Sequence, residues 1–417
     1  MTVAFPVERR KAAPLALISL LMAMFHCAPI FPPVVAAAAG LAPRPFMRDF
    51  QAFFLAATNY RTGVNPYVLS VTDPPLPPFL YPPTSLPLFL PLSWFSQDVS
   101  LLLFELISAA CLFYLFFGIL KAAEEDSWPW SWRIISIVAL TAFYGIAQTL
   151  SYGQVNLIAT AGLMYAWRSA RLGEGNAFRC ALGLFVATLI KTYPALLLLA
   201  FVVRRDWKVV GCFAALGAVD LAYTWATVPA DVWQVYLGEV VPSGRFGVTP
   251  RGLSPETLVW SQSLNGALVK LAGVLVTEKI GLAVQIVVVA LATLALLLRR
   301  HDDHRQFYDL GFGLLMVTAF LIAPLAWSHH YVFLISALAC FAGLLSRNPP
   351  RSQAWSMMLL LATVAIAVKW PELFAHDLPT RLVMTGPIIG PVVLLAMFMT
   401  WSLRARSRQS GATNVSN

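Results

Sequence analysis

The chain has 417 residues, of which 59% are hydrophobic and only 12% charged, and its formal net charge is +9. A soluble domain carries roughly 25% charged residues, so this composition excludes an ordinary water-soluble protein. The basic residues cluster in short segments between apolar runs, as they do on the cytoplasmic side of membrane proteins, and we therefore expect no nucleic-acid binding.

Apolar runs long enough to cross a bilayer recur along the chain, since about twenty helical residues span roughly 30 Å of hydrocarbon. The first run follows Arg9, Arg10 and Lys11 and resembles a secretory signal with a cleavage-like region at 36–40. Cleavage would delete one crossing and spoil the charge pattern, so we interpret this run as a span. We predict crossings near 14–36, 98–120, 133–150, 154–168, 208–228, 278–298, 308–326, 330–346, 354–370 and 382–403.

The segment 179–203 is apolar but is interrupted by Lys191-Thr-Tyr-Pro194. Proline disfavours helix for the residue before it and donates no backbone hydrogen bond, so two short helices meeting at Lys191 fit better than one rod. Counting this hairpin as two passes gives about twelve transmembrane passes in a single all-α domain, residues 1–417. Both termini are then cytoplasmic, most of the 29 Lys and Arg residues lie on that side, and only 405–417 is expected to be disordered.

Two long connections, about 40–97 and 229–277, fall on the outer side, and long ordered loops usually carry function. In the first, Phe50, Phe53 and Ala57 recur at helical spacing between polar residues, which predicts a helix lying in the membrane interface. Eight prolines between positions 74 and 91 exclude a regular lipid-facing helix there. We expect that stretch to pack on protein, as in a re-entrant turn.

Polar side chains also gather on the outer side. Ionisable and amide groups at membrane depth are costly, and by default they line a cavity or pathway. The candidates are Asp49, Arg61, Tyr81, Gln154, Asn156, Lys191, Gln262, Asn265, His329 and His330.

Three of these positions have a structural explanation as well as a functional one. Lys191 at the hairpin apex needs an anion, unless it snorkels to the interface. Asp49 could take a proton from an attacking hydroxyl, but it also stands where a helix N-cap would. One imidazole of the His329–His330 pair could bind a phosphate, or the pair could simply lie at the interface. Consecutive residues on a helix cannot easily chelate one ion, so no metal site is expected.

Seven short segments follow one another in a fixed order. They are Arg48-Asp-Phe-Gln-Ala-Phe-Phe54, Gly63-Val-Asn-Pro-Tyr67, Tyr81-Pro-Pro83, Gly153-Gln-Val-Asn156, Lys191-Thr-Tyr-Pro194, Gln262-Ser-Leu-Asn265 and His329-His-Tyr331. This ordered set, which covers about residues 45 to 345, resembles glycosyltransferase family 87, whose members are polytopic mannosyltransferases. Each segment is short, and the order makes the resemblance specific.

The resemblance implies a GT-C type fold, a polyprenyl-phosphate-linked sugar donor, usually of mannose, and a lipid or glycan acceptor. It also implies inverting transfer on the extracytoplasmic face of the cell (inner) membrane, without a cofactor. Asp49 would be the catalytic base. Lys191, His329, His330 and Arg61 would bind the donor phosphate, and Tyr81, Gln154, Asn156, Gln262 and Asn265 would position the sugar or the acceptor.

A transporter or a flippase of a lipid-linked saccharide is the alternative of another class. Broken helices are common in transporters, but transporter sites lie near the midplane between structural repeats. Here the polar residues gather on one side and no internal repeat is visible. No Walker motif or phosphate-binding glycine loop indicates ATP-driven transport.

Overall fold

The computed structural model describes residues 6–42, 47–69, 76–173, 176–254, 256–347, 353–367 and 388–404. Within these ranges every regular element is a helix. The tail 405–417, for which disorder is predicted, and parts of the last two predicted crossings lie outside the described residues.

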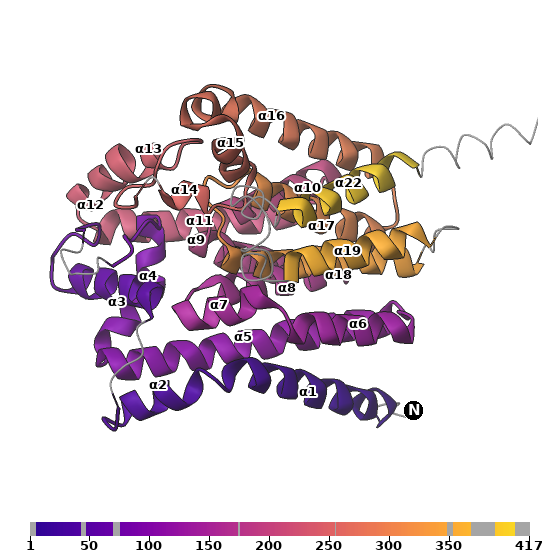
Figure 1. Ribbon diagram of the computed structural model, residues 1–417, viewed down its shortest axis with the longest axis horizontal. Coiled ribbons are helices and arrows are strands. Elements are labelled where there is room, and N and C mark those ends of the chain that lie inside the picture. The colour runs from indigo at the N-terminus through magenta and orange to yellow at the C-terminus, as the bar shows by residue number, and fades with distance from the viewer. Residues whose placement is uncertain are drawn as a thin grey trace, which may run out of the picture.

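The long helices run side by side along the long axis of the molecule, and several short helices gather at one end (Figure 1). Six of the described helices are long and apolar enough to cross a membrane. The chain is therefore a polytopic integral membrane protein. The six are α5 (Gln97–Glu125), the α6–α7 unit (Trp130–Thr141 and Tyr144–Tyr152), α11 (Trp207–Thr227), α16 (Val274–Arg299), α17 (His304–Ile322) and the η5–α18 unit (Ser328–Phe333 and Leu334–Arg347).

The first predicted crossing is a bent pair rather than one straight helix. Helix α1 (Pro6–Cys27) and helix α2 (Phe31–Ala38) meet at 69°. The bend falls where prolines occupy the first turn of α2, and a proline there cannot donate the backbone hydrogen bond that would continue α1. Both helices pack on α5.

The first long loop forms a cap of short helices at the end of the molecule opposite the N-terminus (Figure 1). The predicted helix near Asp49 is present as α3 (Arg48–Arg61), which buries Phe50 and Phe53. The described part of the proline-rich stretch folds into three short helices, of which α4 and η2 pack against α3 and η1 packs against α4. These are η1 (Pro83–Ser85), α4 (Leu86–Phe89) and η2 (Leu90–Trp94).

The predicted hairpin at Lys191 is present. Helix α8 (Asn156–Arg171) is followed by α9 (Ala177–Ile190), Lys191 is extended with φ −136° and ψ 123°, and η3 (Tyr193–Leu197) and α10 (Leu198–Arg204) come next. His304 of α17 bonds to the carbonyl of Ala170 at 2.7 Å. The ring of Tyr308, one turn further along α17, lies 5.1 Å from Phe201 of α10. The chain therefore returns after Lys191 to the end from which α9 starts.

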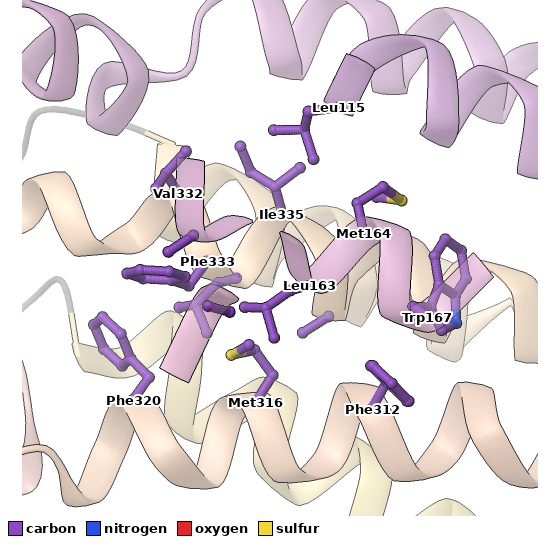
Figure 2. Close-up of a cluster of buried hydrophobic side chains, with 14 of the residues drawn as sticks. Leu115, Leu163, Met164, Trp167, Phe312, Met316, Phe320, Val332, Phe333 and Ile335 are labelled. Carbon is purple, nitrogen blue, oxygen red and sulfur yellow. The ribbon is translucent and has the colours of Figure 1, made fainter. Parts of the chain in front are cut away.

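The core lies between α5, α8, α17 and the η5–α18 unit. Figure 2 shows Leu115, Met164 and Ile335 meeting between these elements, with Trp167 and Phe333 at opposite ends of the cluster. Helices α8 and α9 approach closely because both carry glycine at their contact: a Cβ at Gly162 would lie 2.7 Å from the carbonyl oxygen of Gly183. This packing fixes the hairpin against α17 and η5.

The second long loop and the C-terminal part complete the described structure. Helix α22 ends at the same end of the molecule as the start of α1 (Figure 1). The remaining elements are α12 (Ala230–Val235), the π-helical turn η4 (Tyr236–Val240), α13 (Val241–Ser243), α14 (Glu256–Val259), α15 (Leu264–Ala272), α19 (Ala354–Ala367) and α22 (Ile389–Arg404).

Candidate active site

Asp49 lies in the first turn of α3, and its side chain is only 7% exposed. The N-cap residue of α3 is Met47, so the interpretation of Asp49 as a helix N-cap is wrong. A carboxylate in the first turn is stabilised by the positive end of the helix dipole. The residue is thus placed on a rigid helix, pointing into protein at the capped end of the molecule.

Gly153 brings a hydrogen-bond donor to Asp49. Helix α7 ends at Gly153 in the left-handed conformation (φ 66°), and a Cβ at this position would lie 2.6 Å from the Cβ of Phe50. Only glycine allows α7 to approach α3 this closely. The next residue, Gln154, donates a side-chain hydrogen bond to Asp49, and its own Oε1 is buried without a partner among the described residues.

Lys191 is held by a neutral partner. Its Nζ donates a 3.0 Å hydrogen bond to the hydroxyl of Tyr81 and lies 4.9 Å from the centre of that ring. Tyr81 is fixed in turn by an edge-on contact with Phe53 at 5.1 Å and by Tyr67, whose hydroxyl donates to the Tyr81 carbonyl at 2.6 Å. The hydrogen bond to Tyr81 favours a position of Lys191 inside the site over snorkelling to the interface.

The charge of Lys191 is close enough to act on Asp49, although no ion pair joins the two within the described ranges. Burial raises the pKa of the Asp49 carboxyl, while the hydrogen bond from Gln154 and the charges of Lys191 and Arg48 act in the opposite direction. Burial is the largest of these effects. Asp49 is therefore a stronger proton acceptor than an aspartate in water.

His329 and His330 are both buried, with 2% and 4% exposure, and their ring centres are 4.5 Å apart. The backbone N–H of Trp327 donates to Nδ1 of His330 at 2.9 Å, so a neutral His330 carries its proton on Nε2. In the part of the chain that is described, Nε2 of His329 has no hydrogen-bond partner. Lys191 lies within electrostatic range of both rings.

The turn between α7 and α8 links the histidines to Gln154. Thr149 and Asn156 each donate a 3.2 Å hydrogen bond to the carbonyl of His329. The Oδ1 of Asn156 is buried, and no described group bonds to it. One short segment of chain thus holds Gln154 beside Asp49 and fixes the backbone of η5.

Both polar atoms of the Asn265 side chain bond to backbone groups, so this side chain does not face an open cavity. It is 0% exposed, its Oδ1 accepts from the N–H of Gly247 at 2.8 Å, and its Nδ2 donates to the carbonyl of Pro324 at 2.5 Å. Gln262 donates from its backbone to Ala326 at 2.5 Å. Its Oε1 is buried, and none of the residues described provides a donor.

Arg61 is not brought to the other candidates. It is exposed at the last turn of α3, twelve residues after Asp49. At 1.5 Å per residue that is about 18 Å along the helix. The fold therefore separates Arg61 from Asp49.

Sequence reasoning missed two features. The hydroxyl of Tyr193, two residues after Lys191, is buried without a partner among the described residues. At the opposite end of the molecule, four charged side chains from four helices form ion pairs with one another; three of them are buried and Arg347 is partly exposed. The signal for that second cluster was Asp309, an acid near the start of an apolar run. The four, here called the ion-pair cluster, are Asp126, Arg171, Asp309 and Arg347.

An apolar groove of roughly 230 Å³ lies beside the core, between α5, α6, α18 and α19. Its lining is almost entirely hydrophobic, and it includes Phe143 at the start of α7 and Ile335 in the first turn of α18. Ile335 follows His330 by five residues, which is about 7.5 Å along a helix. The groove therefore starts close to the histidines and continues away from them towards Trp128.

The family model described as glycosyltransferase family 87 matches residues 79–324, more than half of the chain. This range contains Tyr81, Gln154 and Lys191, whereas the two histidines lie just after it and Asp49 lies well before it. The chain belongs to glycosyltransferase family 87. It is a membrane glycosyltransferase, and nothing in the comparisons supports a transporter or a flippase.

Curated relatives from mycobacteria cover most of the chain. A polyprenol-phosphate-mannose-dependent alpha-(1-2)-phosphatidylinositol pentamannoside mannosyltransferase of Mycolicibacterium smegmatis is 27% identical over 320 residues, 74% of this chain and 72% of the relative. A polyprenol-phosphate-mannose-dependent alpha-(1-2)-phosphatidylinositol mannoside mannosyltransferase of the same organism is 26% identical, over 70% of this chain and 68% of the relative. Its counterpart in Mycobacterium tuberculosis is 24% identical, with 70% and 67% covered.

Proposed function

We propose that this family 87 glycosyltransferase moves mannose from a polyprenyl-phosphate donor to a glycolipid acceptor, with inversion at the anomeric carbon. The observation that carries the proposal is the buried Asp49, which is held by Gln154 and faces the charge of Lys191. The names of the relatives support the donor, since all three depend on polyprenol-phosphate-mannose. They also support a lipid acceptor, since the relatives act on phosphatidylinositol mannosides.

Asp49 is the general base in this proposal. The acceptor hydroxyl attacks the anomeric carbon, a new carbon–oxygen bond forms, and the bond from that carbon to the phosphate oxygen breaks. The hydroxyl proton passes to Asp49, and the polyprenyl phosphate leaves with the bonding electron pair. A raised pKa suits this role, because proton transfer is more efficient when the pKa of the base approaches the working pH.

Lys191 and the two histidines bind the phosphate. The negative charge on the leaving phosphate grows as its bond to the sugar breaks, and preorganised donors stabilise that charge best. Lys191 has donors to spare, since an ammonium has three and Tyr81 accepts one. The Nε2 proton of His330 is a further donor, because Nδ1 is occupied by the backbone of Trp327. Arg61 is too far along α3 to contribute.

Buried acceptors without a partner among the described residues bind the sugar or the acceptor. The oxygens Oε1 of Gln154, Oδ1 of Asn156 and Oε1 of Gln262 are buried, and the described residues offer them no donor. Leaving a buried polar atom unpaired costs about 1 to 3 kcal/mol, and a hexose supplies several hydroxyl donors that remove this cost. Asn265 acts indirectly, by holding Pro324 and the segment before the histidines.

The isoprenoid tail of the donor occupies the apolar groove between α5, α6, α18 and α19. Two features support this assignment: the groove starts next to the phosphate-binding histidines, and its lining is apolar along its length. Burying each CH₂ of a lipid chain contributes about 0.8 kcal/mol, so even a few isoprene units would anchor the donor.

We further propose the finer topology of a GT-C type enzyme with about twelve passes, cytoplasmic termini and an extracytoplasmic site. The start of α1 and the end of α22 lie at one end of the molecule, and α3, which carries Asp49, lies at the other (Figure 1). The ion-pair cluster, with Arg171 and Arg347, is at the end that holds the termini, which agrees with the excess of basic residues expected on the cytoplasmic side.

The test uses the purified full chain with radiolabelled polyprenyl-phosphate mannose and phosphatidylinositol mannosides. We expect Asp49→Asn to lower transfer by about 10²- to 10⁴-fold, the usual contribution of a general base. The matched control is Asp231→Asn, an exposed aspartate of the second loop, which should transfer like the wild type. Transfer that survives in Asp49→Asn removes Asp49 as the base. A wild type that transfers no lipid-linked sugar overturns the proposed function.

A further inference from the structure

Tyr193 carries a hydroxyl that has no hydrogen-bond partner among the residues that the structure describes. It is the first residue of η3, two residues after Lys191. Its ring meets Phe333 edge-on, with the ring centres 5.5 Å apart, and Phe333 is three residues after His330. Tyr193 therefore sits between the hairpin apex and η5, the two elements that carry the proposed phosphate ligands.

Tyr81 is a common neighbour of Lys191 and Tyr193. It accepts the hydrogen bond from Lys191, and it lies within electrostatic range of Tyr193. Lys191 and Tyr193 therefore share Tyr81 as a neighbour. A phosphate bound at Lys191 would lie close to Tyr193.

Other buried tyrosines satisfy their hydroxyls. Tyr67 donates to the carbonyl of Tyr81, and Tyr308 donates to Asp206 at 3.2 Å. Among the described residues, the buried tyrosine hydroxyls without a partner are those of Tyr193 and Tyr331, and Tyr331 directly follows His330. An unpaired buried hydroxyl costs about 1 to 3 kcal/mol, and a phenylalanine would fill the same space without that cost. A bound ligand explains why the hydroxyl is there.

We propose that Tyr193 is a further catalytic residue, whose hydroxyl donates a hydrogen bond to the phosphate of the leaving polyprenyl phosphate. This inference rests on the proposed function. In the bound donor the phosphate is a diester with one negative charge. When the bond to the sugar breaks, the electron pair stays on the phosphate oxygen, which becomes a dianionic monoester, and the proton of Tyr193 stays on its own oxygen.

The change of charge determines which kinetic constant Tyr193 affects. A hydrogen bond from a neutral donor strengthens as negative charge accumulates on its acceptor. Tyr193 therefore stabilises the transition state and the product more than the bound donor, and interactions of that kind raise kcat rather than lower KM. Lys191 already supplies charge for binding the donor, so the two residues have separable roles.

The test compares Tyr193→Phe with the wild type in the full-length protein. We expect kcat to fall about 100-fold, in the range that loss of one oxyanion donor costs, with little change in the KM of the donor. Inhibition by the product, polyprenyl phosphate, should weaken about 10-fold, whereas inhibition by uncharged polyprenol stays the same. The melting temperature should not fall, since no hydrogen bond within the described chain is lost.

Tyr308→Phe is the matched control, because it removes a buried tyrosine hydroxyl at the other end of the molecule and should leave kcat unchanged. Unchanged kcat and unchanged product inhibition in Tyr193→Phe would overturn the inference, and so would an equal loss of inhibition by polyprenyl phosphate and polyprenol. A wild type that polyprenyl phosphate does not inhibit would instead point to failure of the proposed function itself.

Discussion

Two clusters of buried polar and charged groups lie at opposite ends of this protein, and they differ in how their groups are paired. In the ion-pair cluster, Arg171 contacts Asp126 at 2.5 Å and Asp309 at 3.1 Å, and Arg347 contacts the same two carboxylates. The indole N–H of Trp167 adds a 2.7 Å hydrogen bond to Asp309. Two carboxylates and two guanidinium groups thus neutralise one another inside the helix bundle.

The cluster around Asp49 also contains a carboxylate and a cation, but a neutral group holds each of them. Asp49 is held by the neutral amide of Gln154, Lys191 by the neutral phenol of Tyr81, and Tyr193 has a hydroxyl with no partner in the described ranges. Burial alone therefore does not distinguish a functional group from a structural one. The distinction is the partner: each charge of the ion-pair cluster contacts an opposite charge, whereas Asp49 and Lys191 are bonded by neutral groups.

The largest effect on stability should come from disrupting the ion-pair cluster. Arg171→Met leaves Asp126 and Asp309 with too few cations, and removing one partner of a buried pair costs about 3 to 5 kcal/mol. We expect a large drop in the melting temperature in detergent, with transfer per folded molecule unchanged. Arg168→Met, which removes the more exposed pair with Glu125, should cost about 1 kcal/mol or less. Equal losses in the two variants would contradict the comparison.

In the cluster around Asp49, removing a charge should have the opposite effect and lower transfer without lowering stability. Lys191→Met takes away a cation that is paired only with a neutral phenol, so the melting temperature should stay the same or rise. Transfer should fall about 10²- to 10³-fold, the cost of losing one preorganised donor to a growing negative charge. Steady-state transfer and thermal unfolding of the same preparation measure both. If unfolding suffers more than transfer, Lys191 is structural and the two clusters are alike.

The sequence could predict this contrast only in part. The break at Lys191 was predictable because Pro194 is a local signal, and the helix that carries Asp49 was predictable from the spacing of its phenylalanines. The N-cap at Met47 was not, because Asp49 is the better capping residue by type. The approach of α7 to α3 at Gly153 was not predictable either, because it is a tertiary contact.

The sequence did not predict the ion-pair cluster or the role of Asn265, because both depend on contacts between segments far apart in the chain. Asp126, Arg171, Asp309 and Arg347 lie near the ends of four helices, and only their packing shows that they form one cluster. Asn265 looked like a sugar ligand by type, yet both of its amide atoms bond to backbone. Residue type indicates which groups are capable of chemistry, and the fold determines which of them remain free.

The smallest expected effect is a shift in pH dependence that separates the two carboxylate environments. A general base must be ionised, so transfer falls as the pH drops through the pKa of Asp49, which burial raises above its ordinary value. Gln154→Met removes the hydrogen bond that stabilises the carboxylate, and the remaining charges of Lys191 and Arg48 do not replace it. The acid limb of kcat/KM should therefore move to higher pH. Trp167→Phe removes the comparable hydrogen bond to Asp309 and should leave that limb unmoved, because a carboxylate between two guanidinium groups takes no part in transfer. If Gln154→Met leaves the acid limb in place, the titrating group is not Asp49. The Asp49 cluster would then have no general base.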